Sequence, residues 1–241
     1  MPDKLYHESI ELISQGRAVL EDLQDWGFET WSPAAEVELP ICSAAQSVAA
    51  SSPATCRSET LAELALRIKD CGLCPLGEQR QNLVFGVGNP RAELVLVGEA
   101  PGREEDKKGV PFVGEAGRLL DRILFAMGLS RQDVYICNVI KCRPPSNRDP
   151  QPEEIATCEA FLKSQLAAIR PRIIIALGRF AAQTLLQTKK PIGRLRGHWQ
   201  TYQGIALMPT FHPAYLLRNP AGKRDVWEDM KLVMQRLKSG E

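Results

Sequence analysis

The sequence lacks any long hydrophobic run, since no apolar stretch approaches the roughly 20 residues that a membrane-spanning helix needs. Its first residues, MPDKLYHESIEL, also lack the basic and then apolar layout of a signal peptide. We therefore expect a cytoplasmic protein without a membrane segment. In that reducing compartment the seven cysteines are not expected to form a set of disulfides. Metal or cluster ligation becomes the leading question about them.

Net charge is also nearly absent, at +1, but the small total hides an asymmetry. Residues 1–60 contain 10 acidic and 3 basic residues, a balance of −7, whereas residues 61–241 carry a balance of +8. A basic domain with an acidic appendage suits a polyanionic partner such as nucleic acid. The alternative is a solvated surface on which the charges are unevenly spread by chance.

The chain divides into three predicted parts. Apolar residues at helical spacing over residues 3–26 predict an acidic N-terminal helix within residues 1–27. Residues 28–57 are rich in Ala, Ser, Pro and Glu without a firm period, which indicates a flexible linker. Residues 58–241 form the main domain. We expect the N-terminal segment to dock on this domain, to bind a partner protein, or to mimic DNA weakly through its acidity.

The main domain alternates short apolar runs with amphipathic segments. These patterns predict strands at residues 93–98, 134–140, 172–177 and 205–208, and helices at residues 58–69, 115–127, 151–170, 179–187 and 226–237. Strands this apolar, separated by helices, are typical of a parallel sheet that is covered on both faces. The predicted fold is therefore a three-layer α/β/α domain with a central four-stranded parallel sheet.

Polar side chains follow three of the predicted strands. Glu99 follows the first strand, Asn138 lies near the end of the second, and His212 follows the fourth. Open α/β sheets bind ligands outside the carboxyl ends of their strands, so a carboxylate, an amide and an imidazole are expected to converge at one edge. Each of them alone is more simply explained as a loop cap, but the three together indicate a site.

Four of the cysteines form a candidate ligand set. Cys71 and Cys74 make a C-x2-C knuckle before the first strand, and Cys142 and Cys158 are separated by fifteen residues. Four thiolates from three segments can hold a tetrahedral Zn²⁺ or an iron–sulfur cluster, and the wide second pair favours the cluster. The alternative is that the second pair are ordinary buried thiols. Cys137 is predicted to be such a thiol, and no role is assigned to the linker residues Cys42 and Cys56.

Six segments, in order, resemble the family 4 uracil-DNA glycosylases, the iron–sulfur members of the uracil-DNA glycosylase superfamily. They are CGLC (71–74), VFGVGNP (84–90), LVLVGEAPGREED (94–106), GVPFVGEAG (109–117), ICNVIKCRPPSNRDP (136–150) and PTFHPAYLLRNP (209–220). The resemblance implies a [4Fe–4S] cluster on the four cysteines, uracil-containing DNA as the substrate, and a uracil-DNA glycosylase-like fold.

The implied reaction needs two charged states to be stabilised. Breaking the bond between C1′ of the sugar and N1 of uracil passes through an oxocarbenium-like transition state, by analogy with glycoside cleavage. The resemblance implies that Glu99 orients the attacking water and faces the cationic sugar. It implies that His212 hydrogen-bonds O2 of uracil and stabilises the leaving anion. The nucleotide must first be flipped out of the duplex.

The resemblance also implies how the flipped base is held. Ala100 and Pro101 would lie against uracil, with a contact from the N–H of Ala100. Phe112 would stack on the base, although a lone aromatic residue is more often plain core. Asn138 would read the polar edge of uracil, although an Asn can also satisfy backbone groups in a turn.

The segment after His212 is implied to enter the minor groove of DNA. Tyr215, Leu216 and Leu217 are apolar enough to occupy the space of the flipped base, and Arg218 is a candidate for a phosphate contact. The alternative is the start of a helix with a solvated basic end. Further phosphate candidates are Lys223, Arg224, Arg143 and Arg148.

The resulting prediction is a monomeric DNA repair enzyme that hydrolyses the N-glycosidic bond of uracil and leaves an abasic site. The loop KCRPPSNRDP contains no histidine, which favours turnover over the covalent trapping known from a relative with a histidine-containing insertion there. Two alternatives stay open. One is a non-catalytic iron–sulfur protein that binds nucleic acid or senses redox state, and the other is a zinc-stabilised domain that acts on free nucleotides.

Overall fold

The computed structural model describes residues 17–18, 21, 24–25 and 59–239. Most of the predicted N-terminal helix and the whole predicted linker over residues 28–57 therefore lie outside the described residues, as do Cys42 and Cys56. The five described residues of the predicted helix are helical, and the Arg17 guanidinium pairs with Glu21 one turn later, at 3.0 Å. The main domain is described almost in full.

One six-stranded sheet forms the centre of the domain, with the strand order β1-β3-β2-β4-β6-β5. The four central strands run parallel, and the two edge strands run antiparallel to their neighbours. The strands are β1 (Val87–Gly88), β2 (Leu94–Gly98), β3 (Tyr135–Asn138), β4 (Ile173–Leu177), β5 (Gln200–Tyr202) and β6 (Ile205–Thr210). The predicted four-stranded parallel core is confirmed. The edge strands were not predicted, because two or three residues are too few to show an alternating pattern.

The predicted helices of the main domain are all present, and four short ones were not predicted. The predicted helices are α2 (Leu61–Ile68), α5 (Glu115–Ala126), α6 (Pro152–Ile169), α7 (Gly178–Leu186) and α10 (Gly222–Ser239). The additional ones are α3 (Leu76–Gln79), α4 (Arg103–Lys108), α8 (Ile192–Leu195) and α9 (Pro213–Arg218). None of these exceeds six residues, which is less than two helical turns and leaves no period to detect.

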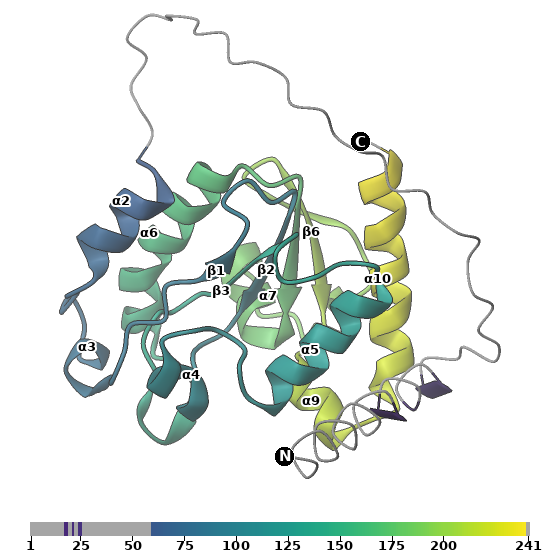
Figure 1. Cartoon of the computed structure of the whole chain (residues 1–241), viewed down its shortest axis with the longest axis horizontal. Coiled ribbons are helices and arrows are strands. Elements are labelled where there is room, and N and C mark those ends of the chain that lie inside the picture. Colours follow the sequence, from purple (N-terminus) through teal and green to yellow (C-terminus); the bar gives the residue numbers. More distant parts are fainter. Residues whose placement is uncertain (1–16, 19–20, 22–23, 26–58, 240–241) are drawn as a thin grey trace, which may run out of the picture.

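Alternate residues of the strands build two cores, one on each face of the sheet. In β2, Val95 and Val97 join the core that packs α2, α6 and α7, whereas Leu94 and Leu96 join the core that packs α5, α9 and α10. Figure 1 shows these two groups of helices on either side of the strands. Burying each such side chain contributes about 1.5–3 kcal/mol, which explains why the strands are apolar throughout. The predicted three-layer architecture is confirmed.

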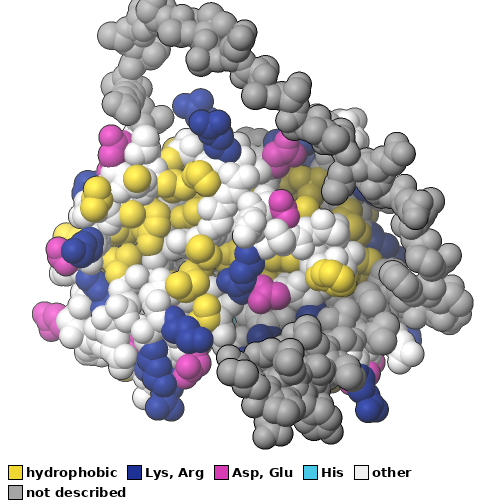
Figure 2. Space-filling model, in the orientation of Figure 1, with side chains coloured by type: hydrophobic (Ala, Val, Ile, Leu, Met, Phe, Trp, Pro, Cys, Tyr) yellow, Lys and Arg dark blue, Asp and Glu magenta, His cyan; other side chains and the backbone are white. Residues whose placement is uncertain are grey.

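The surface carries no large field of one sign on the face shown in Figure 2, where Lys and Arg side chains alternate with Asp and Glu. Hydrophobic side chains gather on the same face between α2 and β1. Over the described ranges, no helix is long and apolar enough to cross a membrane.

Candidate active site

The carboxyl ends of β2, β3 and β6 meet at one edge of the sheet, as predicted. Gly98 of β2 pairs with Asn138 of β3, so Asn138 at the end of β3 and Glu99 just after β2 lie at the same edge of the sheet. A cavity of about 440 Å³ opens there. Its walls contain most of the predicted site residues, namely Glu99, Ala100, Pro101, Phe112, Asn138, His212, Tyr215 and Arg218, together with Arg148. Sequence reasoning missed Gly102, Glu105, Ala116, Pro144, Asn147 and Ala214.

Asn138 presents an unused acceptor to this cavity. The residue is 2 % exposed, and its Oδ1 has no hydrogen-bond partner among the residues that the structure describes. A Cβ at position 98 would lie 2.4 Å from this Oδ1 and 2.6 Å from Cζ of Phe112, so only Gly98 leaves room for both side chains. Because a buried acceptor without a partner costs about 1–3 kcal/mol, its natural partner is a ligand that donates a hydrogen bond.

Phe112 is held in a backbone conformation that favours glycine. Its φ is 54°, in the left-handed region, where a bulky residue is strained. The Arg131 guanidinium donates to the carbonyl oxygens of Pro111 and Phe112, and Gly117 packs so closely that a Cβ there would lie 1.9 Å from the Phe112 oxygen. This support fixes the ring against the cavity, where it stacks on His212 with ring centroids 5.6 Å apart.

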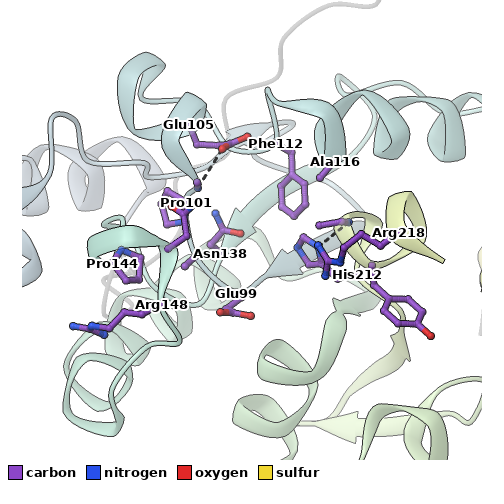
Figure 3. Close-up of a pocket in the computed structure, with 15 residues that line it drawn as sticks. Glu99, Pro101, Glu105, Phe112, Ala116, Asn138, Pro144, Arg148, His212 and Arg218 are labelled. Atoms are coloured by element: carbon purple, nitrogen blue, oxygen red, sulfur yellow. Dashed lines mark hydrogen bonds between the residues drawn. The ribbon is translucent and has the colours of Figure 1, made fainter. Parts of the chain in front are cut away.

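His212 is neutral and has a defined tautomer. Burial and, to a smaller extent, the positive charge of Arg218 lower its pKa to about 4, against an opposing effect of Glu105. The backbone N–H of Ala214 donates to Nδ1 at 3.1 Å, which makes Nδ1 an acceptor (Figure 3). The single ring proton must then sit on Nε2. The imidazole can therefore donate one hydrogen bond from Nε2 to a group in the cavity.

Glu99 is the ionisable acid of the cavity. Burial and, to a smaller extent, the negative charge of Asp149 raise the pKa of its carboxyl to about 7, against an opposing effect of Arg179. Asp149 and Arg179 are themselves paired at 3.2 Å. Near neutral pH, the Glu99 carboxyl is thus present in both its protonated and its ionised form, as is typical of a group that acts in proton transfer.

Glu105 is the clearest residue that sequence reasoning missed. Its carboxylate accepts from the N–H groups of Val113 at 2.8 Å and Gly114 at 3.0 Å, and from Gly102 at 3.1 Å. It thereby ties the loop after β2 to the loop that carries Phe112. The sequence contained one signal for it: Glu105 lies three residues after Gly102, the spacing at which an acidic side chain caps the start of a helix such as α4. That helix has no apolar residue, so no period revealed it.

The segment predicted to enter DNA forms helix α9, and the structure corrects one of its residues. Leu216 is fully buried, at 0 % exposure, in the core beneath α9, so its side chain is not available as a wedge. Tyr215 and Leu217 are 39 % and 41 % exposed. Helix α9 packs against α5 and places Leu216 in the core that they share, which spacing alone did not reveal.

The predicted phosphate contacts differ in their availability. Arg218 lines the cavity beside α9, and Arg148 lies on the opposite side of it (Figure 3). Both outer nitrogens of Arg148 already contact Glu154, at 2.6 and 2.9 Å. Lys223 donates to Asp25 of the acidic N-terminal part at 2.7 Å. Arg218 is therefore the candidate that the structure leaves best placed.

The four candidate cysteines share one region at the side of the sheet covered by α2 and α6. Cys142 and Cys158 are buried there, and Cys71 and Cys74 pack against the same core. Burial raises the pKa of the Cys142 thiol, with smaller effects from the nearby Cys74 and Cys71. Burial likewise raises the pKa of Cys158 to about 11. Cys137 is buried in the same core, within β3, and its burial agrees with the prediction of an ordinary buried thiol.

The donors around these sulfurs test which group they fit. The Arg80 guanidinium donates to Sγ of Cys142 at 3.2 Å, and the Lys141 backbone N–H donates to Sγ of Cys158 at 3.3 Å. Over the described ranges, no group of three or more His, Cys, Asp or Glu side chains is arranged to hold a metal ion. Four cysteine thiols, two of which accept hydrogen bonds from protein donors, have the donor chemistry that an iron–sulfur cluster takes.

Comparison with known proteins agrees with this geometry. Residues 85–231 match the profile of the Uracil DNA glycosylase superfamily. A type-4 uracil-DNA glycosylase of Thermotoga maritima is 48 % identical over 181 residues, covering 73 % of this chain and 93 % of the relative. One of Archaeoglobus fulgidus is 45 % identical over 183 residues, with coverages of 73 % and 92 %. A type-5 uracil-DNA glycosylase of Pyrobaculum aerophilum is 32 % identical over 146 residues, with coverages of 54 % and 64 %. The chain therefore belongs to the uracil-DNA glycosylase superfamily and, within it, to the type-4 uracil-DNA glycosylases.

Proposed function

We propose that this chain removes uracil from DNA by hydrolysing the N-glycosidic bond and leaves an abasic site. The observation that carries the proposal is the cavity at the strand ends. It brings an unpartnered buried amide oxygen, a neutral imidazole and a carboxyl with a raised pKa to one place. The three side chains match the three tasks of the reaction: reading the base, stabilising it as it leaves, and directing water.

Recognition follows from the free Oδ1 of Asn138. Uracil offers an N3–H donor beside an O4 acceptor, and the side-chain amide complements both, with Oδ1 accepting N3–H and the amide nitrogen donating to O4. Phe112 would stack on the flipped base, and Ala100 and Pro101 would lie along its edge. Cytosine offers the opposite pattern and would leave buried polar groups unpaired.

Bond cleavage follows from His212 and Glu99. As the C1′–N1 bond breaks, its electron pair moves to uracil and collects at O2, where the Nε2–H of His212 donates. A donor aimed at developing charge in a dry site contributes roughly 3–4 kcal/mol. The carboxylate of Glu99 faces the cationic sugar and accepts a hydrogen bond from the water that attacks C1′.

We infer that Cys71, Cys74, Cys142 and Cys158 hold a [4Fe–4S] cluster. Such a cluster would supply a structural cross-link between the segment before β2, the loop after β3 and helix α6. Because Cys142 lies four residues after Asn138, the cross-link would fix the strand end that reads uracil. Tyr215, Leu217 and Arg218 would contact the DNA around the flipped nucleotide.

The deciding experiment is incubation of the purified chain with a labelled oligonucleotide that contains one uracil, followed by alkaline cleavage of abasic sites. We expect strand scission at the uracil and none in a thymine control. A non-catalytic cluster protein that only binds nucleic acid would bind the oligonucleotide and leave it alkali-resistant. That result would overturn the proposed activity.

The ionisation of Glu99 predicts the pH dependence of the reaction. Because the active form is the carboxylate and its pKa is about 7, kcat/KM should rise with pH through about 7 and then level off. His212, with a pKa near 4, stays neutral over this range and adds no second limb. The measurement is kcat/KM for uracil excision between pH 5 and 9.

Two neighbours of Glu99 provide matched variants with opposite signs. Asp149→Asn removes a negative charge and should move the rising limb to lower pH, whereas Arg179→Gln removes a positive charge and should move it to higher pH. Displacement of both profiles in the same direction would show that another group controls the limb.

The acidic N-terminal part predicts a change in DNA affinity on truncation. Deleting residues 1–57 removes nine acidic and three basic residues, and with them the pair between Asp25 and Lys223. Binding to uracil-free duplex should become tighter and more salt-dependent, because more cations can displace counterions from DNA. Titrations at several salt concentrations measure this. Unchanged affinity, or loss of uracil excision, would contradict a separable acidic appendage.

A further inference from the structure

Lys141 is the largest fully buried side chain of the domain, and neither recognition of uracil nor the cysteine set accounts for its ammonium. The residue is 1 % exposed. Its Nζ donates to the carbonyl oxygen of Asn138 at 2.6 Å and to Oε1 of Gln165 at 2.5 Å. Across the described ranges it forms no ion pair with a carboxylate. Burying an ammonium costs several kcal/mol unless it is hydrogen-bonded. Moving Nζ away from these two acceptors would therefore be unfavourable, and the side chain is held in place.

The backbone of Lys141 is tied as closely as its side chain. Its N–H donates to Sγ of Cys158 at 3.3 Å, and its carbonyl oxygen accepts from the N–H of Val84 at 2.8 Å. Gln165, which lies on the same helix as Cys158, is fully buried and donates onward to the carbonyl oxygen of Phe85 at 2.8 Å. A continuous set of hydrogen bonds thus runs from helix α6 through Lys141 to the backbone of Asn138.

The Oδ1 of Asn138 has no comparable support, since it accepts no hydrogen bond from any of the described residues. Its aim into the cavity must come from its backbone and from the gap that Gly98 leaves. The carbonyl oxygen to which Lys141 donates belongs to Asn138 itself, at the end of β3, so this hydrogen bond adds to the pairing of Asn138 with Gly98 in the sheet. A misplacement of about 1 Å at a site that orients a substrate can cost as much as 100-fold in rate.

We infer that Lys141 is a positioning residue for uracil excision. Its hydrogen bonds to the Asn138 carbonyl and to Gln165 of α6 hold the Asn138 backbone, and with it the orientation of the Asn138 side chain. The inference rests on the proposed function, because it assigns Lys141 an effect through the residue that reads the base. This role differs from that of surface lysines, whose positive charges would attract the DNA phosphates.

The test uses Lys141→Met, which keeps the length of the side chain and removes its ammonium, in the full chain as purified with its iron. The matched control is Lys163→Met, on the exposed side of the same helix α6. Single-turnover excision at saturating enzyme should fall about 10- to 100-fold in Lys141→Met and stay unchanged in the control. Iron content, visible absorption and affinity for uracil-free duplex should stay at the wild-type level in both.

A double-mutant cycle separates positioning from a general loss of structure. If Lys141 acts through Asn138, then Lys141→Met should cost almost nothing in an Asn138→Ala background, since the side chain that it aims is gone. Losses that multiply in the double variant, or a wild-type rate in Lys141→Met, would overturn the inference.

If Lys141→Met does not fold or loses its iron, Gln165→Met replaces it in the cycle, because this variant keeps the Lys141 ammonium and removes one of its two hydrogen-bond partners. A three- to tenfold loss that vanishes with Asn138→Ala is then expected, and a loss that multiplies overturns the inference. Failure of the wild-type chain to cleave uracil would instead refute the proposed function.

Discussion

Asn138→Asp is expected to lower single-turnover excision of uracil by roughly 100- to 10,000-fold. The new carboxylate lacks the N–H donor for O4 and repels that oxygen, so two buried polar contacts are lost or reversed. Each such loss costs on the order of 1.5–3 kcal/mol where a charged group is involved, and each 1.4 kcal/mol is a factor of ten in rate. The Oδ1 of the native residue is buried beside Gly98 and has no partner within residues 59–239, so no group there compensates for the lost contacts.

The specificity of the variant provides a second readout of the same contact. A carboxylate at position 138 can accept from the N4 amino group of cytosine, so a weak gain of cytosine excision is expected. Asn89→Asp is the matched control: it introduces the same charge outside the cavity and keeps the acceptor for the N–H of Arg91. If Asn138→Asp excises uracil at the wild-type rate, Asn138 is not the reader and the recognition site is misassigned.

Replacing any one of Cys71, Cys74, Cys142 and Cys158 by Ser is expected to remove the visible colour and to destabilise the fold. The wild-type chain purified without oxygen should contain about four irons and absorb broadly near ~400 nm. Loss of the cross-link should lower Tm on the order of 10 °C, which at about 2–4 °C per kcal/mol corresponds to roughly 3–5 kcal/mol. Iron analysis, absorption spectra and thermal melts measure the three effects.

The control for the cysteine series is Cys137→Ala. Cys137 is buried in β3 close to the set, so its loss perturbs packing but should leave iron content unchanged. The expected contrast is therefore in the metal analysis rather than in Tm. Stoichiometric zinc in place of iron under strict exclusion of oxygen would refute the cluster and favour the tetrahedral zinc site that the sequence left open.

The parts of the fold that the sequence predicted are those with a strong local signal. The strands that became β2 and β4 are apolar throughout, because both of their faces are covered, and such runs stand out in any sequence. The long helices carry an apolar period or a stop residue. By contrast, α4 is made only of charged residues, and its existence depends on the capping by Glu105 and on the contacts that this carboxylate makes with the Phe112 loop.

The sequence was enough to predict the four central strands, the long helices, the convergence of Glu99, Asn138 and His212 at one sheet edge, and the four candidate cysteines. These predictions depend on periodicity, on residue spacing and on the parallel arrangement of strands. The three-dimensional structure was needed to show that Leu216 faces the core, that His212 carries its proton on Nε2, and that Glu99 titrates near neutral pH. It alone revealed the grip of Lys141 on Asn138. Burial, hydrogen bonding and the field of distant charges arise from residues far apart in the chain, so no sequence spacing contains them.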